Sequence, residues 1–126
     1  MRFLSPEWLT AAAGALRAVA PRETGAHLVV QQIVTNGPDG EVAYLVRIST
    51  DAVELVPGRG DADVVFTEDW DTAAAIGEGR LSPQAALMEG RIRTSGNVSV
   101  VMAAQDTLAS VESALAGVRA ATTYGR

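Results

Sequence analysis

The spacing of apolar and polar positions changes along the chain and divides it into helical and extended stretches. Residues 6–19 carry apolar side chains at intervals of three and four, the repeat of an amphipathic helix, and Pro21 closes that helix. Ser5 is placed to cap its start, with Leu4 and Leu9 forming a hydrophobic staple around the cap. The sequence therefore predicts an N-terminal helix with one apolar side.

The repeat then shortens to that of an extended chain. The runs 27–35 and 41–50 are rich in β-branched and aromatic residues, and the Asn-Gly-Pro-Asp-Gly sequence at 36–40 joins them. This combination predicts a hairpin. Two shorter runs, 52–56 and 62–66, follow on either side of a loop rich in glycine. We expect the four strands to form a meander with one face toward the core.

Two short helices are expected next, within the stretch 66–97. Thr67 is expected to cap the first helix, with acidic residues in its opening turn, and Ser82 to cap the second, with Pro83 at its first helical position. Glycine residues follow both and end them. Helices this short are marginal in water. Their apolar faces must therefore pack against a larger element.

A fifth strand and a final helix complete the pattern. In residues 91–95, Ile92 and Thr94 point one way and the arginines point the other way, toward solvent. Asn97 is expected to cap one long helix. The apolar stripe of that helix favours packing on a sheet over a coiled coil, because it spans fewer than three heptads. The stripe consists of Val101, Ala104, Leu108, Val111, Leu115 and Val118.

Composition narrows the possible functions. A chain of 126 residues is long enough for a single domain with its own core, and we assign residues 1–126 to one. The absence of cysteine excludes thiol catalysis, disulfides and thiolate metal sites. The net charge of −5 disfavours nucleic acid and anionic membranes as partners. No apolar run reaches transmembrane length, and charges interrupt the apolar N-terminal stretch, so we expect a cytoplasmic protein.

Candidate catalytic and metal-binding residues are sparse. His27 is the only histidine, so a histidine metal site lacks a second ligand and a catalytic triad would depend on a residue at the start of a strand. The acidic residues between 61 and 71 lack the spacing of a calcium loop. We therefore expect neither a metal nor a cofactor.

Medium-sized apolar side chains remain in excess on elements that must face the sheet. Core packing is their usual role. An apolar ligand pocket is the alternative, because short helices bounded by glycine pack less completely than long ones. The candidate ligand-binding residues are Phe66, Trp70, Ile76, Leu81, Leu87, Met88, Ile92, Val101, Met102 and Leu108.

The order of the predicted elements resembles the sterol carrier protein family of lipid-binding domains. The resemblance is carried by the tryptophan in the first short helix, by Ser-Pro-Gln-Ala-Ala-Leu-Met-Glu-Gly at 82–90, by Arg-Ile-Arg at 91–93 and by Gly96-Asn97. Leu-Ser-Pro-Glu-Trp at 4–8 is similar to small single-domain bacterial members. The resemblance implies an α+β fold, in which a five-stranded mixed sheet is covered by helices around an apolar tunnel. It also implies binding of sterols, fatty acids or acyl-CoA without catalysis.

From these observations we expect a carrier for an apolar or amphipathic lipid. The ligand would lie between the sheet, the helices around Trp70 and Met88, and the last helix. Two alternatives stay open. The first is an interaction module whose pocket is filled by side chains and which acts through a protein partner or a homodimer. The second is an enzyme, for which no acid, base or nucleophile stands out.

Overall fold

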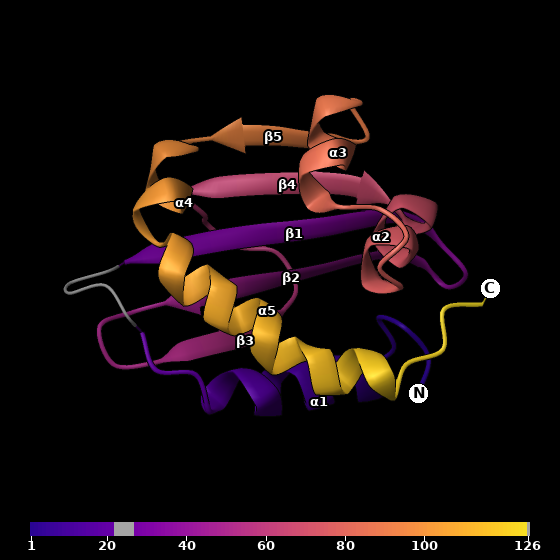
Figure 1. Cartoon of the computed structure of the whole chain (residues 1–126), viewed down its shortest axis with the longest axis horizontal. Helices are drawn as coiled ribbons and strands as arrows, with labels where there is room; N and C mark the ends of the chain where they lie inside the picture. The colour runs from indigo at the N-terminus through magenta and orange to yellow at the C-terminus, as the bar shows by residue number, and fades with distance from the viewer. Residues whose placement is uncertain (22–26, 126) are drawn as a thin grey trace.

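The computed structural model of this protein describes residues 1–21 and 27–125. Five strands form one mixed sheet in the order β3-β2-β1-β4-β5, and the longest helices, α1 and α5, lie together on one face of it (Figure 1). We call this the inner face. The elements are α1 (Pro6–Arg17), β1 (Leu28–Gly37), β2 (Gly40–Ile48), β3 (Val53–Pro57), β4 (Val64–Asp69), α2 (Trp70–Gly77), α3 (Pro83–Met88), β5 (Ile92–Gly96), α4 (Ser99–Ala103) and α5 (Gln105–Ala120). The predicted fold class, a five-stranded mixed sheet with these covering helices, is confirmed.

The core lies between the inner face and the two long helices. Side chains of a strand alternate between the two faces, and every second residue along most of the first three strands is buried or half-buried on the face that α1 and α5 cover. The predicted apolar stripes of both helices supply the opposite wall. The core includes Leu28, Val30, Val34, Ile48, Val53, Leu55 and Val64 from the sheet, Trp8, Ala12 and Leu16 from α1, and Val111 and Val118 from α5.

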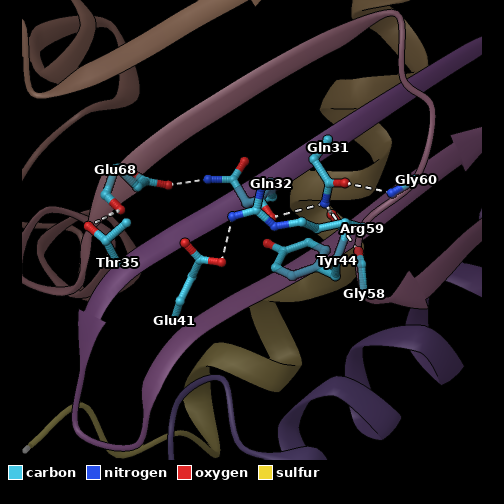
Figure 2. Close-up of polar contacts among 9 residues, drawn as sticks. All are labelled: Gln31, Gln32, Thr35, Glu41, Tyr44, Gly58, Arg59, Gly60 and Glu68. Atoms are coloured by element: carbon cyan, nitrogen blue, oxygen red, sulfur yellow. Dashed lines mark hydrogen bonds and ion pairs between the residues drawn. The ribbon is translucent and has the colours of Figure 1, made fainter.

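The fourth strand does not continue the expected meander. β1, β2 and β3 are successive antiparallel neighbours, but β4 lies beside β1 and runs parallel to it. The segment between β3 and β4 crosses the outer face, where the Gln31 amide donates to the Gly58 carbonyl at 3.2 Å and accepts from the Gly60 N–H at 3.0 Å (Figure 2). The crossing segment contacts a face on which Gln31, Ile33 and Leu45 are buried. An antiparallel continuation from the edge strand β3 would not cross this face.

Two of the four helix caps predicted from the sequence are present in the structure. The Ser5 and Ser82 hydroxyls accept from backbone N–H groups at the starts of α1 and α3, each at 3.1 Å. Thr67 is not a cap, because pairing with β1 and β5 keeps the chain extended to Asp69. The Asp69 carboxylate caps α2 instead, accepting from the Thr72 N–H at 2.8 Å. The expected first short helix therefore begins later in the chain than predicted.

The expected single C-terminal helix is divided in two. Ala104 has φ −111° and ψ 19°, which ends α4 and starts α5. The Asn97 side chain accepts from the Ser99 N–H at 3.2 Å just before α4, but Val98 occupies the cap position of that short helix and makes no side-chain cap hydrogen bond. The break places both Ala104 and Thr107 in the interior.

An aromatic cluster joins the two ends of the chain. The Phe3 ring lies 5.3 Å from Trp8, 5.1 Å from Trp70 and 4.8 Å from Tyr124, measured between ring centroids. The Phe3 N–H also donates to the Thr123 carbonyl at 3.0 Å, and both termini lie at this side of the molecule (Figure 1). The cluster therefore fixes α2, through Trp70, to both ends of the described chain.

The backbone at Gly96, at the end of β5, requires a glycine. Its φ is +95°, and a Cβ atom would collide with the carbonyl oxygen of Asp63. We predict that Gly96→Ala lowers the free energy of unfolding by about 1–3 kcal/mol, since the left-handed backbone strain adds to this clash. Gly117→Ala is the control, because that glycine lies inside α5 with open space around it. It should stabilise the protein by up to about 1 kcal/mol through helix propensity. Urea unfolding followed by circular dichroism measures both, and equal stability of Gly96→Ala and the wild type would refute the assignment.

Candidate functional site

The inner face of β4 and β5 extends beyond the long helices. α1 and α5 lie over β1, β2 and β3, whereas β4 and β5 continue outward between α4 at one end and α2 and α3 at the other (Figure 1). Four half-buried side chains share this face, Phe66 and Glu68 from β4 and Ile92 and Thr94 from β5. Gln32 of β1 is paired with Phe66 and lies on the same face. We call these five residues the β4–β5 face.

The β4–β5 face combines apolar rings and methyl groups with three polar side chains. Gln32 Nε2 donates a hydrogen bond to Glu68 Oε1 (Figure 2). The other carboxyl oxygen, Glu68 Oε2, is buried without a hydrogen-bond partner among the described residues, and so is Thr94 Oγ1. Glu68 pairs with Ile92 and Thr94 pairs with Phe66, so Glu68 and Thr94 are diagonal neighbours, which lie about 7–8 Å apart in a sheet. An unpaired buried polar atom typically costs about 1–3 kcal/mol.

The environment of Glu68 disfavours its charged form. Burial raises the pKa of its carboxyl to about 7, repulsion by Asp69 adds to the rise, and the hydrogen bond from Gln32 opposes it. Near neutral pH the group therefore exists in both protonation states. Burial also raises the pKa of the Tyr44 phenol, which is paired with Gln32 across β1 and β2 and stays neutral. The site thus offers one carboxyl that titrates under physiological conditions.

Exposed apolar side chains stand at both ends of β5. Leu87 is 49% exposed and Met88 is 88% exposed at the end of α3, while Val98 is 47% exposed and Met102 is 66% exposed around α4. Figure 1 places α3 and α4 at opposite ends of the strand. Large apolar side chains with this exposure are typical of binding surfaces when they surround a common site.

The ten predicted ligand-binding residues fall into three groups. Phe66 and Ile92 lie on the β4–β5 face, and Leu87, Met88 and Met102 are exposed near its ends. Val101 and Leu108 are half-buried and pack against the core. The remaining three belong to α2 and its following loop: Trp70 is buried in the aromatic cluster, and Ile76 and Leu81 are half-buried. The structure therefore brings Phe66 and Ile92 together and places the α2 residues at another location.

Sequence reasoning missed the polar part of the β4–β5 face. Glu68 was assigned to the first turn of a helix, which hid its two-residue spacing from Phe66. With the strand extended to Asp69, Phe66 and Glu68 share a face, as do Ile92 and Thr94. The alternation of β5 shows which residues share a face, but that of β4 depends on a strand end at Asp69 that no local pattern marks.

Two hollows lie away from the β4–β5 face. One, of about 390 Å³, is lined by Trp70 and Leu81 together with Arg80, Arg91 and Tyr124. The Arg91 Nε–H donates to Thr72 Oγ1 at 3.1 Å, so this side chain, predicted to face only solvent, also ties β5 to α2. The other, of about 610 Å³, lies between the end of α1 and the side of α5, next to Ala20 and Asp106. Among the described residues, no group of three metal-ligating side chains occurs. In that same part of the chain, no helix is long and apolar enough to cross a bilayer.

Comparisons with known proteins agree with this architecture. The sequence profile of the SCP-2 sterol transfer family matches residues 10–109. A crystal structure of sterol carrier protein 2 is similar over 91% of this chain and 98% of its own, with 20% identity and a TM-score of 0.69. A Thermus thermophilus protein, described as possibly a sterol carrier protein, is similar over 94% of this chain and 90% of its own, with 22% identity and a TM-score of 0.66. No curated protein sequence matches.

The same fold also occurs inside a longer enzyme. A double mutant of a sec-alkyl sulfatase is similar over 83% of this chain but only 16% of its own, with 14% identity and a TM-score of 0.60. At these identities the solved structures show a shared fold alone. The family profile covers most of this chain, so it is the stronger evidence for family membership.

The raised pKa of Glu68 predicts how stability depends on pH. Its pKa is about 7 in the folded state, against an ordinary value of 4.5, so the folded state holds more protons between these values and stability falls as pH rises through them. Glu68→Gln keeps an acceptor for Gln32 without the charge. Above pH 7 we expect this variant to be more stable than the wild type, by on the order of 2 kcal/mol, and near pH 4 we expect little difference.

Urea unfolding across this pH range measures the effect. Glu54→Gln serves as the control, because Glu54 is exposed on the outer face of β3. It should leave the slope between about pH 4.5 and 7 nearly unchanged. A Glu68→Gln protein with the same pH profile as the wild type would show that burial does not perturb this carboxyl.

Proposed function

This chain belongs to the SCP-2 sterol transfer family, and from that membership we propose that it binds and transfers an amphipathic lipid, held on the β4–β5 face. The observation that carries the proposal is the position of Phe66 and Ile92. Both are apolar, only half-buried, and placed on the part of the inner face that lies beyond the long helices. An apolar ligand would complete the cover of the sheet there.

The exposed apolar side chains extend the proposed site along β5. Leu87 and Met88 would contact the ligand at one end, and Met102 would contact it at the other. Val101 and Leu108 would form its wall toward the core. In this proposal Trp70, Ile76 and Leu81 support the site through α2, since Trp70 is held in the aromatic cluster.

Burial of a lipid chain on this face would supply useful affinity. Burying about 400 Å² of lipid at about 25 cal/mol per Å² gives roughly 10 kcal/mol before association costs. Those costs remove several kcal/mol. Micromolar binding follows without any polar anchor, a suitable strength for a carrier that must also release its lipid. We propose no catalytic step.

A second candidate function is supported by the same exposed side chains. The fold occurs as a small part of a much longer sec-alkyl sulfatase, and Met88 and Met102 are 88% and 66% exposed. The domain would then act as an interaction module that packs on a protein partner or on a second copy of itself. Such a module needs roughly 1,000 Å² or more of buried interface to be stable.

The two faces of β5 provide a matched test of lipid binding. Ile92→Ala removes apolar contact on the β4–β5 face and should weaken binding of the fluorescent apolar probe Nile red about five- to thirtyfold, given about 1–2 kcal/mol for the lost side chain. Arg93→Ala alters the exposed outer face of the same strand and should change the affinity less than about twofold. Native mass spectrometry of the purified protein should show a co-purified lipid. Absence of any lipid together with absence of Nile red binding would refute the carrier function.

Self-association distinguishes the interaction module from the carrier. Sedimentation velocity should show a monomer whose sedimentation does not change with concentration. The double variant Met88→Ser, Met102→Ser should also be a monomer, with weaker Nile red binding, because these side chains would contact lipid rather than protein. A concentration-dependent dimer that the double variant dissociates would support the interaction module instead.

A further inference from the structure

We propose that Glu68 and Thr94 form a polar station that holds the hydroxyl head group of a long-chain alcohol or similar neutral lipid and discriminates against lipid carboxylates. This inference rests on the proposed lipid binding and specifies the ligand class. It starts from two buried oxygen atoms, Glu68 Oε2 and Thr94 Oγ1, which have no hydrogen-bond partner among the described residues.

The station is positioned by three neighbouring strands. Gln32 on β1 donates to Glu68 Oε1 on β4 and so fixes the carboxyl on the β4–β5 face (Figure 2). The second oxygen of that carboxyl remains unpaired among the described residues. Thr94 on β5 is a diagonal neighbour of Glu68 on the same face. Phe66 pairs with Thr94, and Ile92 pairs with Glu68, so each polar group has an apolar neighbour on the adjacent strand.

The donor and acceptor inventory selects a hydroxyl. An ionised carboxylate only accepts hydrogen bonds, whereas a threonine hydroxyl both donates and accepts. A ligand hydroxyl can donate to Glu68 Oε2 and accept from Thr94 Oγ1, which gives both atoms a partner. A ligand carboxylate has no proton to donate and brings a second negative charge next to Glu68. Like charges at such short range in a partly buried site are strongly unfavourable.

The surrounding charges reinforce this preference. Asp69 follows Glu68 on β4 and adds negative potential. Tyr44 lies across β1 from the station. On α5, Glu112 and Arg119 form an ion pair of 2.5 Å, in which Glu112 raises the pKa of the Tyr44 phenol and Arg119 lowers it. Arg91, directly before β5, donates to Thr72. None of these contacts supplies Glu68 with a neutralising cation.

Protonation of Glu68 should weaken the preference for a hydroxyl over a carboxylate. The Glu68 carboxyl has a pKa of about 7, so it becomes neutral below that pH and no longer repels a ligand carboxylate. Fatty-acid affinity should therefore rise as pH falls, while alcohol affinity should change little. Since a free fatty acid ionises near the ordinary range for carboxyl groups, it is still mostly charged when Glu68 has already taken up its proton.

Displacement of Nile red by dodecanol and by dodecanoate tests the station in the intact protein. At about pH 8 we expect dodecanol to bind at least about tenfold more tightly, and at about pH 5.5 the ratio should shrink to about threefold or less. Glu68→Gln should give the smaller ratio at both pH values. Thr94→Val should weaken dodecanol binding by about two- to tenfold, as expected for the loss of one neutral hydrogen bond, with little effect on dodecanoate.

Two matched controls separate the station from general charge and packing effects. Glu54→Gln removes an exposed carboxyl on the outer face of β3, and Ser95→Ala removes an exposed hydroxyl next to Thr94. Both should behave as the wild type. Retention of the full alcohol preference at about pH 8 in Glu68→Gln, or equal binding of both ligands by the wild type, would overturn this inference and leave lipid binding intact. Failure of both ligands to displace Nile red, with Ile92→Ala unaffected, would refute the lipid site itself.

Discussion

The parallel pairing of β1 with β4 is the contact on which the other parts of this structure depend. It joins six residue pairs, from Val30 with Val64 to Thr35 with Asp69, and it requires the chain to cross the outer face after β3. That crossing contributes to the cover over Gln31, whose amide bonds Gly58 and Gly60 in the first half of the crossing segment. The pairing also keeps β4 extended to Asp69. Glu68 is therefore a strand residue facing Gln32, rather than the first turn of a helix.

The same pairing determines where the polar residues of the β4–β5 face meet. A shift of one residue in β4 would move Phe66 and Glu68 to the outer face, because strand side chains alternate with a period of two. At the observed register, Glu68 reaches Gln32 on one side and neighbours Ile92 on the other. Gly96 contributes to this register, since its positive φ and lack of a side chain permit close approach to Asp63. The pairing of the strand backbones therefore determines which face carries the hydrogen-bond acceptors of the site.

Much of the fold follows from local signals in the sequence. The caps at Ser5 and Ser82, the hairpin turn and the alternation of β5 depend on neighbouring residues, and the structure agrees with each. The parallel partner of β4 depends on residues distant in the chain, as in the pairing of Val30 with Val64, and no local pattern encodes such a pairing. The length of β4, the cap at Asp69 and the orientation of Glu68 all follow from that partner. For this reason the apolar residues Phe66 and Ile92 could be proposed from the sequence, whereas Gln32 and Glu68 could not; the alternation of β5 did place Thr94 on the face of Ile92, but without a polar partner.

The open part of the inner face follows from the width of the sheet. Five strands spaced about 4.8 Å apart present a surface roughly 20–25 Å wide, and two helices packed side by side, each about 10 Å across, cover about four strands at most. α1 lies over the β3 edge and contacts both β3 and α5, so this pair is displaced away from β5 (Figure 1). The short helix α4 follows β5 and lies at its end rather than along it, and the break at Ala104 separates α4 from α5. Phe66, Ile92 and their polar neighbours therefore lie where the described chain supplies no long helix, and the amphipathic ligand that we propose would cover them there.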